Sequence, residues 1–223
     1  MTMNLVSRVA LPTDRFRRRR MRQFMREFQP TSGTRILDVG GTPLNWGLVD
    51  LRSDVVLLNP VAPPNVELPP NLTWAEGDGC HLPYRDAEFD VCFSNSTIEH
   101  LHTRHNQELF ASEVRRVAGS YYVQTPARSF PVEPHWLGFF VHWFPRGWQR
   151  RLVRYITLYG LVIKPDEPQI DALLDEYRLL SYRELRELFP DAEIRRERFM
   201  LLTKSYVAVR RGAARGRVLM GQS

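Results

Sequence analysis

The sequence has little of what a membrane-spanning or secreted protein needs. Among its 223 residues only Cys80 and Cys92 are cysteines, too few for a disulfide framework. Its longest apolar run, WLGFFVHWF at 136–144, falls well short of the roughly 20 residues that cross a bilayer. The basic residues near the start are not followed by an apolar stretch, so this segment is not typical of a secretory signal. These absences lead us to expect a cytoplasmic protein.

The loop DVGGTPLNW at 38–46 lacks the later glycines of a dinucleotide-binding loop. Thr42 and Pro43 stand in their place. Proline has no N–H, so this loop is poorly suited to cradling a pyrophosphate. Gly40 and Gly41 still let the backbone approach a ligand closely, and Asp38 can accept hydrogen bonds from one. Taken alone, the loop fits either a cofactor loop or a tight turn after a buried strand.

Positive charge is what the sequence has in excess. The formal net charge is +6, and arginine-rich clusters at 15–28, 146–155 and 210–217 carry much of it. Such clusters are typical of proteins that bind nucleic acid, anionic lipid or an anionic substrate. Each cluster could equally be a solvated helix face or an exposed tail. Charge alone therefore does not choose among these partners.

Apolar residues recur in a pattern of alternating strands and helices. Hydrophobic residues make up 43% of the chain, which is enough for a sizeable core. The pattern predicts helices at 14–28 and 106–118, and strands at 35–39, 55–59, 72–77, 89–95, 120–126, 192–199 and 204–211. Strands that alternate with helices indicate a doubly wound α/β fold with a mostly parallel sheet. The closing strand pair would add one antiparallel strand to it.

Residues 126–180 interrupt this alternation. They are rich in aromatic residues and proline, hold no obvious strand, and include predicted helices at 145–160 and 168–180. Ser181 and Glu184 form a capping-box pattern that opens the helix after them. We predict an inserted helical cap over the carboxyl ends of the strands, where such sheets bind ligands. The predicted layout is a basic N-terminal helix at 1–32, a main domain at 33–211 that contains the insert at 126–180, and a flexible tail at 212–223.

Polar residues follow the second, third and fourth predicted strands. Asn59 ends the second strand, where a dinucleotide fold has a ribose-binding carboxylate, and its amide can donate to and accept from hydroxyls. Asp78 lies just past the third strand, beside Gly79 and Cys80, and can accept from an adenine amine. The fourth strand leads into SNSTIEHL at 94–101. The ends of these strands should converge on one site.

These motifs together resemble class I S-adenosylmethionine-dependent methyltransferases, specifically the type 11-like methyltransferase domain. ILDVGG resembles the first motif of that family, GDGCHLPY its adenine-contacting segment, and FDVCFSNSTIEHL its fourth-strand signature. The resemblance covers about residues 33–126 with the spacing intact. It implies a Rossmann-like, seven-stranded sheet, methyltransferase activity and S-adenosyl-L-methionine as cofactor. A cofactor without phosphates also makes Pro43 acceptable in the first loop.

The resemblance also assigns roles to the residues of the candidate donor site. It implies that Asp38 and Gly40, with Gly41, surround the methionine moiety, and that Asn59 contacts the ribose. Asp78, Gly79 and Cys80 would contact the adenine, and Ser94 and Asn95 would face the donor near its methyl group. The usual third glycine and the usual ribose-binding acid are absent from this sequence.

The acceptor side has few candidate residues. Methyl transfer needs an aligned nucleophile and a dry site, and a hydroxyl nucleophile also needs a base. TPARSFPVEPHW at 125–136 resembles a segment of methyltransferases associated with glycan and lipid modification. We predict His135 as the base, with Glu133 orienting it or binding substrate, and His100 as a second candidate. Either histidine could instead be a packing residue. The histidines near residue 100 lack the spacing of metal ligands, so we predict no metal site.

Several functions stay open from the sequence. The first is O-methylation of a sugar, glycolipid or other small acceptor. The second is methylation of RNA, for which the basic N-terminal helix is the only support and which is the weaker alternative. The third is a non-catalytic nucleoside-binding or regulatory domain. The aromatic residues of the insert would form an acceptor pocket, a peripheral membrane contact or the core of the cap; they are Trp136, Phe139, Phe140, Trp143, Phe144 and Trp148.

Overall fold

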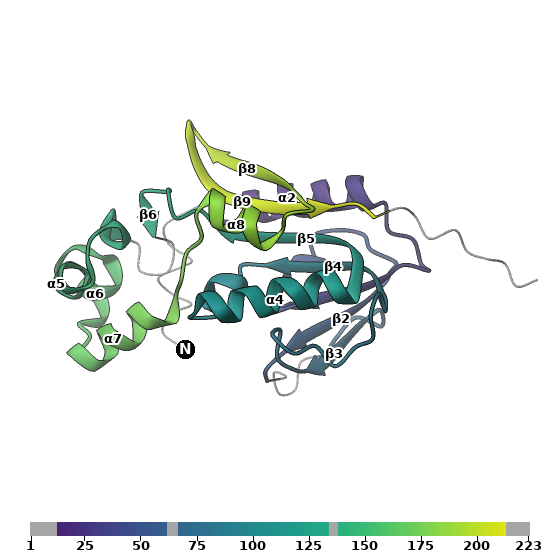
Figure 1. Ribbon diagram of the computed structural model, residues 1–223, viewed down its shortest axis with the longest axis horizontal. Helices are drawn as coiled ribbons and strands as arrows, with labels where there is room; N and C mark the ends of the chain where they lie inside the picture. Colours follow the sequence, from purple (N-terminus) through teal and green to yellow (C-terminus); the bar gives the residue numbers. More distant parts are fainter. Residues whose placement is uncertain (1–12, 62–66, 134–137, 213–223) are drawn as a thin grey trace, which may run out of the picture.

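A seven-stranded sheet organises the protein, in the strand order β3-β2-β1-β4-β5-β9-β8 (Figure 1). The computed structural model describes residues 13–61, 67–133 and 138–212. The strands of this sheet are β1 (Arg35–Val39), β2 (Asp54–Asn59), β3 (Leu72–Glu76), β4 (Phe89–Asn95), β5 (Ala118–Pro126), β8 (Glu193–Phe199) and β9 (Leu202–Arg210). The helices around it are α2 (Thr13–Phe28), α3 (Pro43–Trp46), η1 (Ile98–His100), α4 (Arg104–Val117) and α8 (Tyr182–Leu188).

The direction of the strands matches the doubly wound fold that the sequence predicts. β1, β2, β3, β4 and β5 pair in parallel, and β9 runs antiparallel between β5 and β8. The parallel strands end at one edge of the sheet, which is where loops gather into a ligand site in such folds. The prediction of a mostly parallel sheet with one reversed strand is confirmed.

Two hydrophobic cores cover the two faces of the sheet. Neighbouring strand residues point to opposite faces, so Tyr121 packs in the core under α4 and α8 while Tyr122 packs in the core under α2. Figure 1 shows α4 and α8 in front of the sheet and α2 behind it. The predicted capping box of α8 is present, since Ser181 and Glu184 satisfy each other's backbone N–H groups.

Helix α2 is packed against the sheet along its whole apolar side. Phe24 is fully buried and meets the rings of Trp46, Phe93 and Tyr122 edge-on, with centroid distances of 5.7, 5.2 and 5.9 Å. The opposite side of the helix is exposed and carries arginines. The amphipathic pattern predicted for this helix is therefore what attaches it to the sheet.

The insert after β5 forms its own small unit of helices. It contains β6 (Val132–Glu133), β7 (Gly138–Phe139), η2 (Val141–Trp143), α5 (Arg146–Ile156), α6 (Leu158–Ile163) and α7 (Glu167–Glu176). The short β6–β7 pair was not predicted. The predicted helix at 145–160 is two helices, because Thr157 has extended backbone angles and its side chain accepts the N–H of Gly160 to start α6.

The core of the insert is aliphatic rather than aromatic. Val141, Val153, Ile170, Leu173 and Leu174 are buried together. The described aromatic residues predicted as an alternative core are exposed; they are Phe139, Phe140, Trp143, Phe144 and Trp148. That alternative is therefore wrong for these residues. Aliphatic side chains at helical spacing on α5 and α7 were enough to join the helices.

The insert contacts the main domain near the ends of β4 and β5. The backbone N–H of Arg178 donates to the carbonyl of Glu99 at 2.8 Å, and that of Arg128 donates to Leu180 at 3.0 Å. In Figure 1, α5, α6 and α7 lie together beyond this end of the sheet. Within the described part of the chain, no helix is both long and apolar enough to cross a membrane.

Candidate functional site

The predicted donor residues lie around the carboxyl end of β1. The N–H of Gly40 donates to Leu58 of β2 at 2.8 Å, and the hydroxyl of Ser94 on β4 donates to the carbonyl of Val39 at 2.9 Å. The Cα of Gly79, after β3, faces the side chain of Val39 so closely that a Cβ there would come within 2.9 Å of it. The structure therefore brings segments after four strands to one edge.

Gly40 occupies a position that only glycine suits. Its φ of +74° lies in the left-handed region, and a Cβ would come within 2.6 Å of Thr97 Cγ2 and closer still to the hydroxyl. Thr97, whose hydroxyl donates to the carbonyl of Val39 at 3.2 Å, fills this space itself. Gly40 is therefore needed for the packing of the loop after β4, whether or not a ligand approaches its backbone.

Asp38 is fully buried beneath the same loop. Its Oδ2 accepts the indole N–H of Trp46 at 2.8 Å, while its Oδ1 has no hydrogen-bond partner in the described part of the chain. Burial raises the pKa of Asp38 well above its usual range, and the bond from Trp46 offsets only part of this. A Cβ on Gly41 would meet this carboxyl group. An orphaned, buried acceptor of this kind fits a site that receives a cationic or N–H-bearing ligand.

The proline in the first loop has a structural role. Pro43 is the first residue of α3, where its missing N–H has no intrahelical partner to lose. Helix α3 has 4 residues and ends at Trp46, which turns inward to bond Asp38. This short turn replaces the glycine-rich entry into a longer helix. The loop thus differs from a dinucleotide-binding loop at Pro43, and the short helix that Pro43 begins places Trp46 over the buried carboxyl group of Asp38.

Asn59 lies beside the first loop, as its predicted role requires. Its Nδ2 donates to the carbonyl of Gly41 at 2.6 Å, and its own carbonyl accepts the N–H of Gly77 at 2.9 Å. Its side chain is only partly buried. The amide oxygen can still accept a hydroxyl from a ligand at this edge.

Asp78 is an exposed carboxylate in a turn after β3. It accepts the backbone N–H of Cys80 at 2.9 Å and the ring N–H of His81 at 2.9 Å. These two bonds, the Cys80 bond foremost, hold the pKa of Asp78 below its usual value, so it is charged at neutral pH. Cys80 is buried, and burial and the charge of Asp78 raise the pKa of its thiol to about 11, which leaves it protonated. The carboxylate of Asp78 is therefore the charged group of this segment.

Ser94 and Asn95, at the end of β4, have side chains engaged within the protein. Ser94 is fully buried and bonds Val39, so its predicted contribution to the donor site rests on its backbone. The amide oxygen of Asn95 accepts a hydrogen bond from Arg20 of α2. Arg20 in turn forms an ion pair with Glu197 of β8 at 2.7 Å. If Asn95 contacts a donor as predicted, it does so while its amide oxygen is bonded to Arg20.

The candidate acceptor residues are only partly described. His135 lies outside the described residues, and of Glu133 the structure describes the backbone, which pairs with Gly138 in β6 and β7. His100 is partly buried in η1, and its ring meets that of Tyr177 edge-on at 4.8 Å. Tyr177 follows α7, so this contact joins η1 to the insert.

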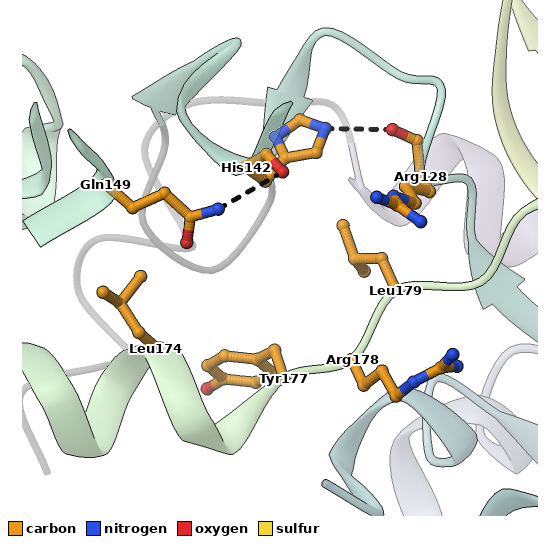
Figure 2. A pocket seen from close by; sticks show the side chains of 7 residues that line it. All are labelled: Arg128, His142, Gln149, Leu174, Tyr177, Arg178 and Leu179. Carbon is orange, nitrogen blue, oxygen red and sulfur yellow. Dashed lines mark hydrogen bonds between the residues drawn. The ribbon is translucent and has the colours of Figure 1, made fainter. Parts of the chain in front are cut away.

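A cavity of about 270 Å³ lies on the insert side of this contact (Figure 2). It is lined by Arg128, His142, Gln149, Leu174, Tyr177, Arg178 and Leu179. The Nε2–H of His142 donates to the carbonyl of Arg128 at 3.0 Å, which holds the ring at the rim. Arg178 is bonded by Gln107 and Glu184, whereas in the described part of the chain no acceptor pairs with the guanidinium of Arg128. Among the described residues, the cavity therefore offers the positive charge of Arg128 without an acceptor, beside several hydrogen-bonding groups.

Sequence reasoning missed the residues that line the cavity and the partner of Asp38. Arg128, His142 and Arg178 meet at one cavity although they lie far apart in the chain, and no local spacing pointed to them. Trp46 stood within the quoted first loop, and its place shortly after Asp38 was the only available signal.

The comparisons with known proteins agree with a methyltransferase domain on this fold. Residues 49–120 match a family model described as a methyltransferase domain. This range includes Asn59, Asp78, Gly79, Cys80, Ser94, Asn95 and His100. No curated protein matches the chain.

Solved structures that superpose on this chain have low sequence identity to it. A protein from Bordetella parapertussis superposes with a TM-score of 0.58 at 14% identity, covering 90% of this chain and 70% of that one. The PH0226 protein from Pyrococcus horikoshii OT3 has a TM-score of 0.52 at 16% identity, covering 89% and 91%. A S-adenosylmethionine-dependent methyltransferase from Methanosarcina mazei matches at a TM-score of 0.47 and 12% identity, over 83% and 94%. The two superpositions with a TM-score above 0.5 show the fold, and the match over residues 49–120 confirms the predicted methyltransferase domain.

Proposed function

We propose that this methyltransferase transfers the methyl group of S-adenosylmethionine to an oxygen of a small acceptor, such as a sugar or glycolipid, that carries a negatively charged group. The observation that carries the proposal is the cavity beside His100. It offers the guanidinium of Arg128, with which no acceptor pairs among the residues that the structure describes. Its position next to η1 puts it beside the loop that follows β4. Acceptors in this fold must approach the carboxyl edge of the sheet.

The donor would be held by the residues around the end of β1. S-adenosylmethionine supplies a methyl group bound to a positively charged sulfur. When the methyl group is transferred, the sulfur remains in a neutral thioether, S-adenosylhomocysteine. Asp38 offers a buried oxygen without a partner to the methionine moiety, next to Gly40 and Gly41. Asn59 would bond the ribose, and Asp78 with Gly79 and Cys80 would border the adenine. Ser94 and Asn95 would face the methyl group from β4.

The acceptor hydroxyl needs a group to take its proton. His100 and His135 are the candidate bases, and Glu133 is a candidate orienting or binding residue. His100 is supported by its contact with Tyr177, which lines the cavity. As the acceptor oxygen forms its bond to the methyl carbon, its proton would pass to an imidazole nitrogen. The insert, by lying beside this edge, would help to exclude water.

Transfer of radioactive methyl groups tests both the activity and the acceptor cavity. We expect tritiated methyl from S-adenosylmethionine to enter a small-molecule fraction of a cell extract. Arg128→Met should require about tenfold more of that fraction for half-maximal transfer, because a charge-assisted bond to the acceptor is lost. Its backbone carbonyl, which holds His142, is retained in this variant.

The matched control for Arg128→Met is Arg183→Met. Arg183 is highly exposed and pairs with Glu187 on α8, outside the cavity. Donor affinity, measured by calorimetry, should be unchanged in both variants. Equal transfer by Arg128→Met and the wild type would contradict the proposed acceptor site, and absence of transfer into any fraction would contradict the proposed activity.

Replacement of Asp78 tests the adenine side of the donor site. Asp78→Ala should weaken S-adenosylmethionine binding by about tenfold or more, because a charged acceptor is removed. His81→Ala is the control, since it removes the ring bonded to Asp78 but keeps the carboxylate and its bond from Cys80. Calorimetry with S-adenosylmethionine measures both. Unchanged affinity in Asp78→Ala would show that the adenine lies elsewhere.

RNA is the second candidate acceptor, and one observation favours it. The exposed side of α2 carries a stripe of arginines, which are Arg15, Arg18, Arg19, Arg22 and Arg26. A basic stripe of this kind can follow a phosphate backbone. An RNA acceptor would make binding fall steeply with salt. Methyl transfer that survives reversal of these charges would count against RNA.

A further inference from the structure

The outer side of α5 carries an exposed stripe of aromatic residues. Phe144, Trp148 and Tyr155 are 43%, 64% and 68% exposed. Arg151 lies between the last two, and the spacing of Trp148, Arg151 and Tyr155 puts them on one side of α5, while Phe144 lies just before the helix. The rings of Phe144 and Trp148 are stacked, with centroids 6.5 Å apart. We call these four residues the α5 stripe.

Further apolar side chains are exposed around the α5 stripe. Phe139, Phe140 and Trp143, which precede it in the chain, are 63%, 46% and 50% exposed. Ile156, Leu161 and Val162 at the end of α5 and on α6 are exposed as well. Single exposed apolar residues are ordinary, but so many on neighbouring short elements mark an interaction surface. Figure 1 shows α5 and α6 at one end of the molecule, beyond the sheet.

The segment that carries these exposed side chains has positive charge only, and the acids paired with it are on α7. Residues 134–165 contain no aspartate or glutamate, and the cations among them are Arg146, Arg150, Arg151, Arg154 and Lys164. Arg150 is paired with Asp171 of α7, whereas in the described part of the chain no acceptor pairs with Arg151. A cavity of about 340 Å³ between α5 and α7 is lined by three arginines, Arg150, Arg151 and Arg154, with Tyr155 and one carboxylate, Glu167, beside them. Its arginines can receive an anionic oxygen.

We propose that the α5 stripe and the exposed residues of η2 and α6 dock the protein on an anionic phospholipid surface. Tryptophan, tyrosine and phenylalanine favour the boundary between headgroups and acyl chains, and arginine beside them binds the headgroup phosphates. The aliphatic residues of α6 would contact the acyl region. The protein would thus lie on the membrane through the insert.

Other occupants fit this surface less well. A second copy that packs through the same face would bring two surfaces of the same positive charge together, which is unfavourable. Single-stranded nucleic acid could stack on the aromatic rings, but Ile156, Leu161 and Val162 offer no stacking surface for a base. A lipid surface uses the rings, the aliphatic side chains and the arginines together. The proposal does not depend on the acceptor proposed above.

Vesicle flotation with the full-length protein tests the docking surface. We expect the protein to float with vesicles of phosphatidylcholine and phosphatidylglycerol, and far less with phosphatidylcholine alone. Phe144→Ala with Trp148→Ala should lower the fraction bound about tenfold, because both exposed rings lose their lipid contacts. Arg151→Glu should do the same for the anionic vesicles.

The matched control is Met200→Ala with Leu201→Ala. These residues are 84% and 91% exposed at the β8–β9 turn and are not part of the proposed docking surface, so vesicle binding should stay unchanged. All variants alter exposed side chains, and thermal unfolding and calorimetry with S-adenosylmethionine should match the wild type. Equal binding to both vesicle types, binding unaffected by either α5 variant, or displacement of the vesicles by an RNA oligonucleotide would overturn the proposal.

Discussion

Replacing Arg20 with methionine is expected to lower the free energy of unfolding by about 3–5 kcal/mol, because it leaves a buried carboxylate without its partner. Arg20 is only 6% exposed, and its guanidinium donates to both carboxylate oxygens of Glu197, at 3.1 and 2.7 Å. A further N–H reaches Asn95. One side chain thus joins α2 to β8 and to the end of β4. Chemical denaturation measures the loss.

The effect of Arg20→Met should depend on pH. Burial alone would raise the pKa of Glu197, but the charge and hydrogen bonds of Arg20, with the hydroxyl of Ser205, outweigh it and hold the pKa below 4.5. In the wild type the carboxylate therefore contributes stability above its unfolded pKa, and this is lost as the pH falls through the folded pKa. In the variant the pKa should rise, so charging the group costs stability at neutral pH. The difference in free energy of unfolding between the wild type and Arg20→Met should therefore become smaller at acid pH.

The control for this prediction removes both charges. Arg20→Met with Glu197→Leu should recover much of the lost stability, because no buried charge is left without a partner. A double variant as unstable as Arg20→Met, or a loss that does not change with pH, would contradict the account. Since Asn95 also loses its donor in Arg20→Met, calorimetry with S-adenosylmethionine on the double variant tests whether this network positions the end of β4.

Replacing Gly40 with alanine is expected to destabilise the fold and to weaken the donor site together. Backbone strain at a φ of +74° and overpacking against Thr97 each cost about 1–3 kcal/mol. To relieve the clash the loop after β4 or the first loop must move, and both border the proposed donor site. We therefore expect a loss of about 3 kcal/mol in stability and more than about tenfold in affinity for S-adenosylmethionine.

Glycine variants elsewhere serve as the control for Gly40→Ala. Gly119, in β5, has open space around its Cα, with no atom within 4 Å of an added Cβ, so Gly119→Ala should leave stability and donor affinity unchanged. Combining Gly40→Ala with Thr97→Ala should restore part of the stability, because the nearest side-chain atoms are removed. If Gly40→Ala left stability and donor affinity as unchanged as Gly119→Ala does, the close packing of Gly40 against Thr97 would be refuted.

Local patterns in the sequence were sufficient for the sheet and for placing the residues of the proposed donor site at one edge of it. Strands such as β1 and β4 are near-continuous apolar runs, which is the pattern of strands covered on both faces. Because parallel strands end at one edge, the residues that follow them, such as Asn59 and Asp78, had to lie near one another. The capping box of α8 is likewise local, and it too was predictable.

Only the tertiary structure decided which partner each polar side chain has and which apolar residues stay exposed. Arg20 and Asn95 are 75 positions apart, and Arg20 and Glu197 are 177 apart, so no spacing rule connects them. The aromatic residues of the insert have the composition of a core, yet smaller aliphatic side chains fill that core and leave the rings outside. Burial depends on which helix faces meet, and that is a property of the packed chain rather than of any segment.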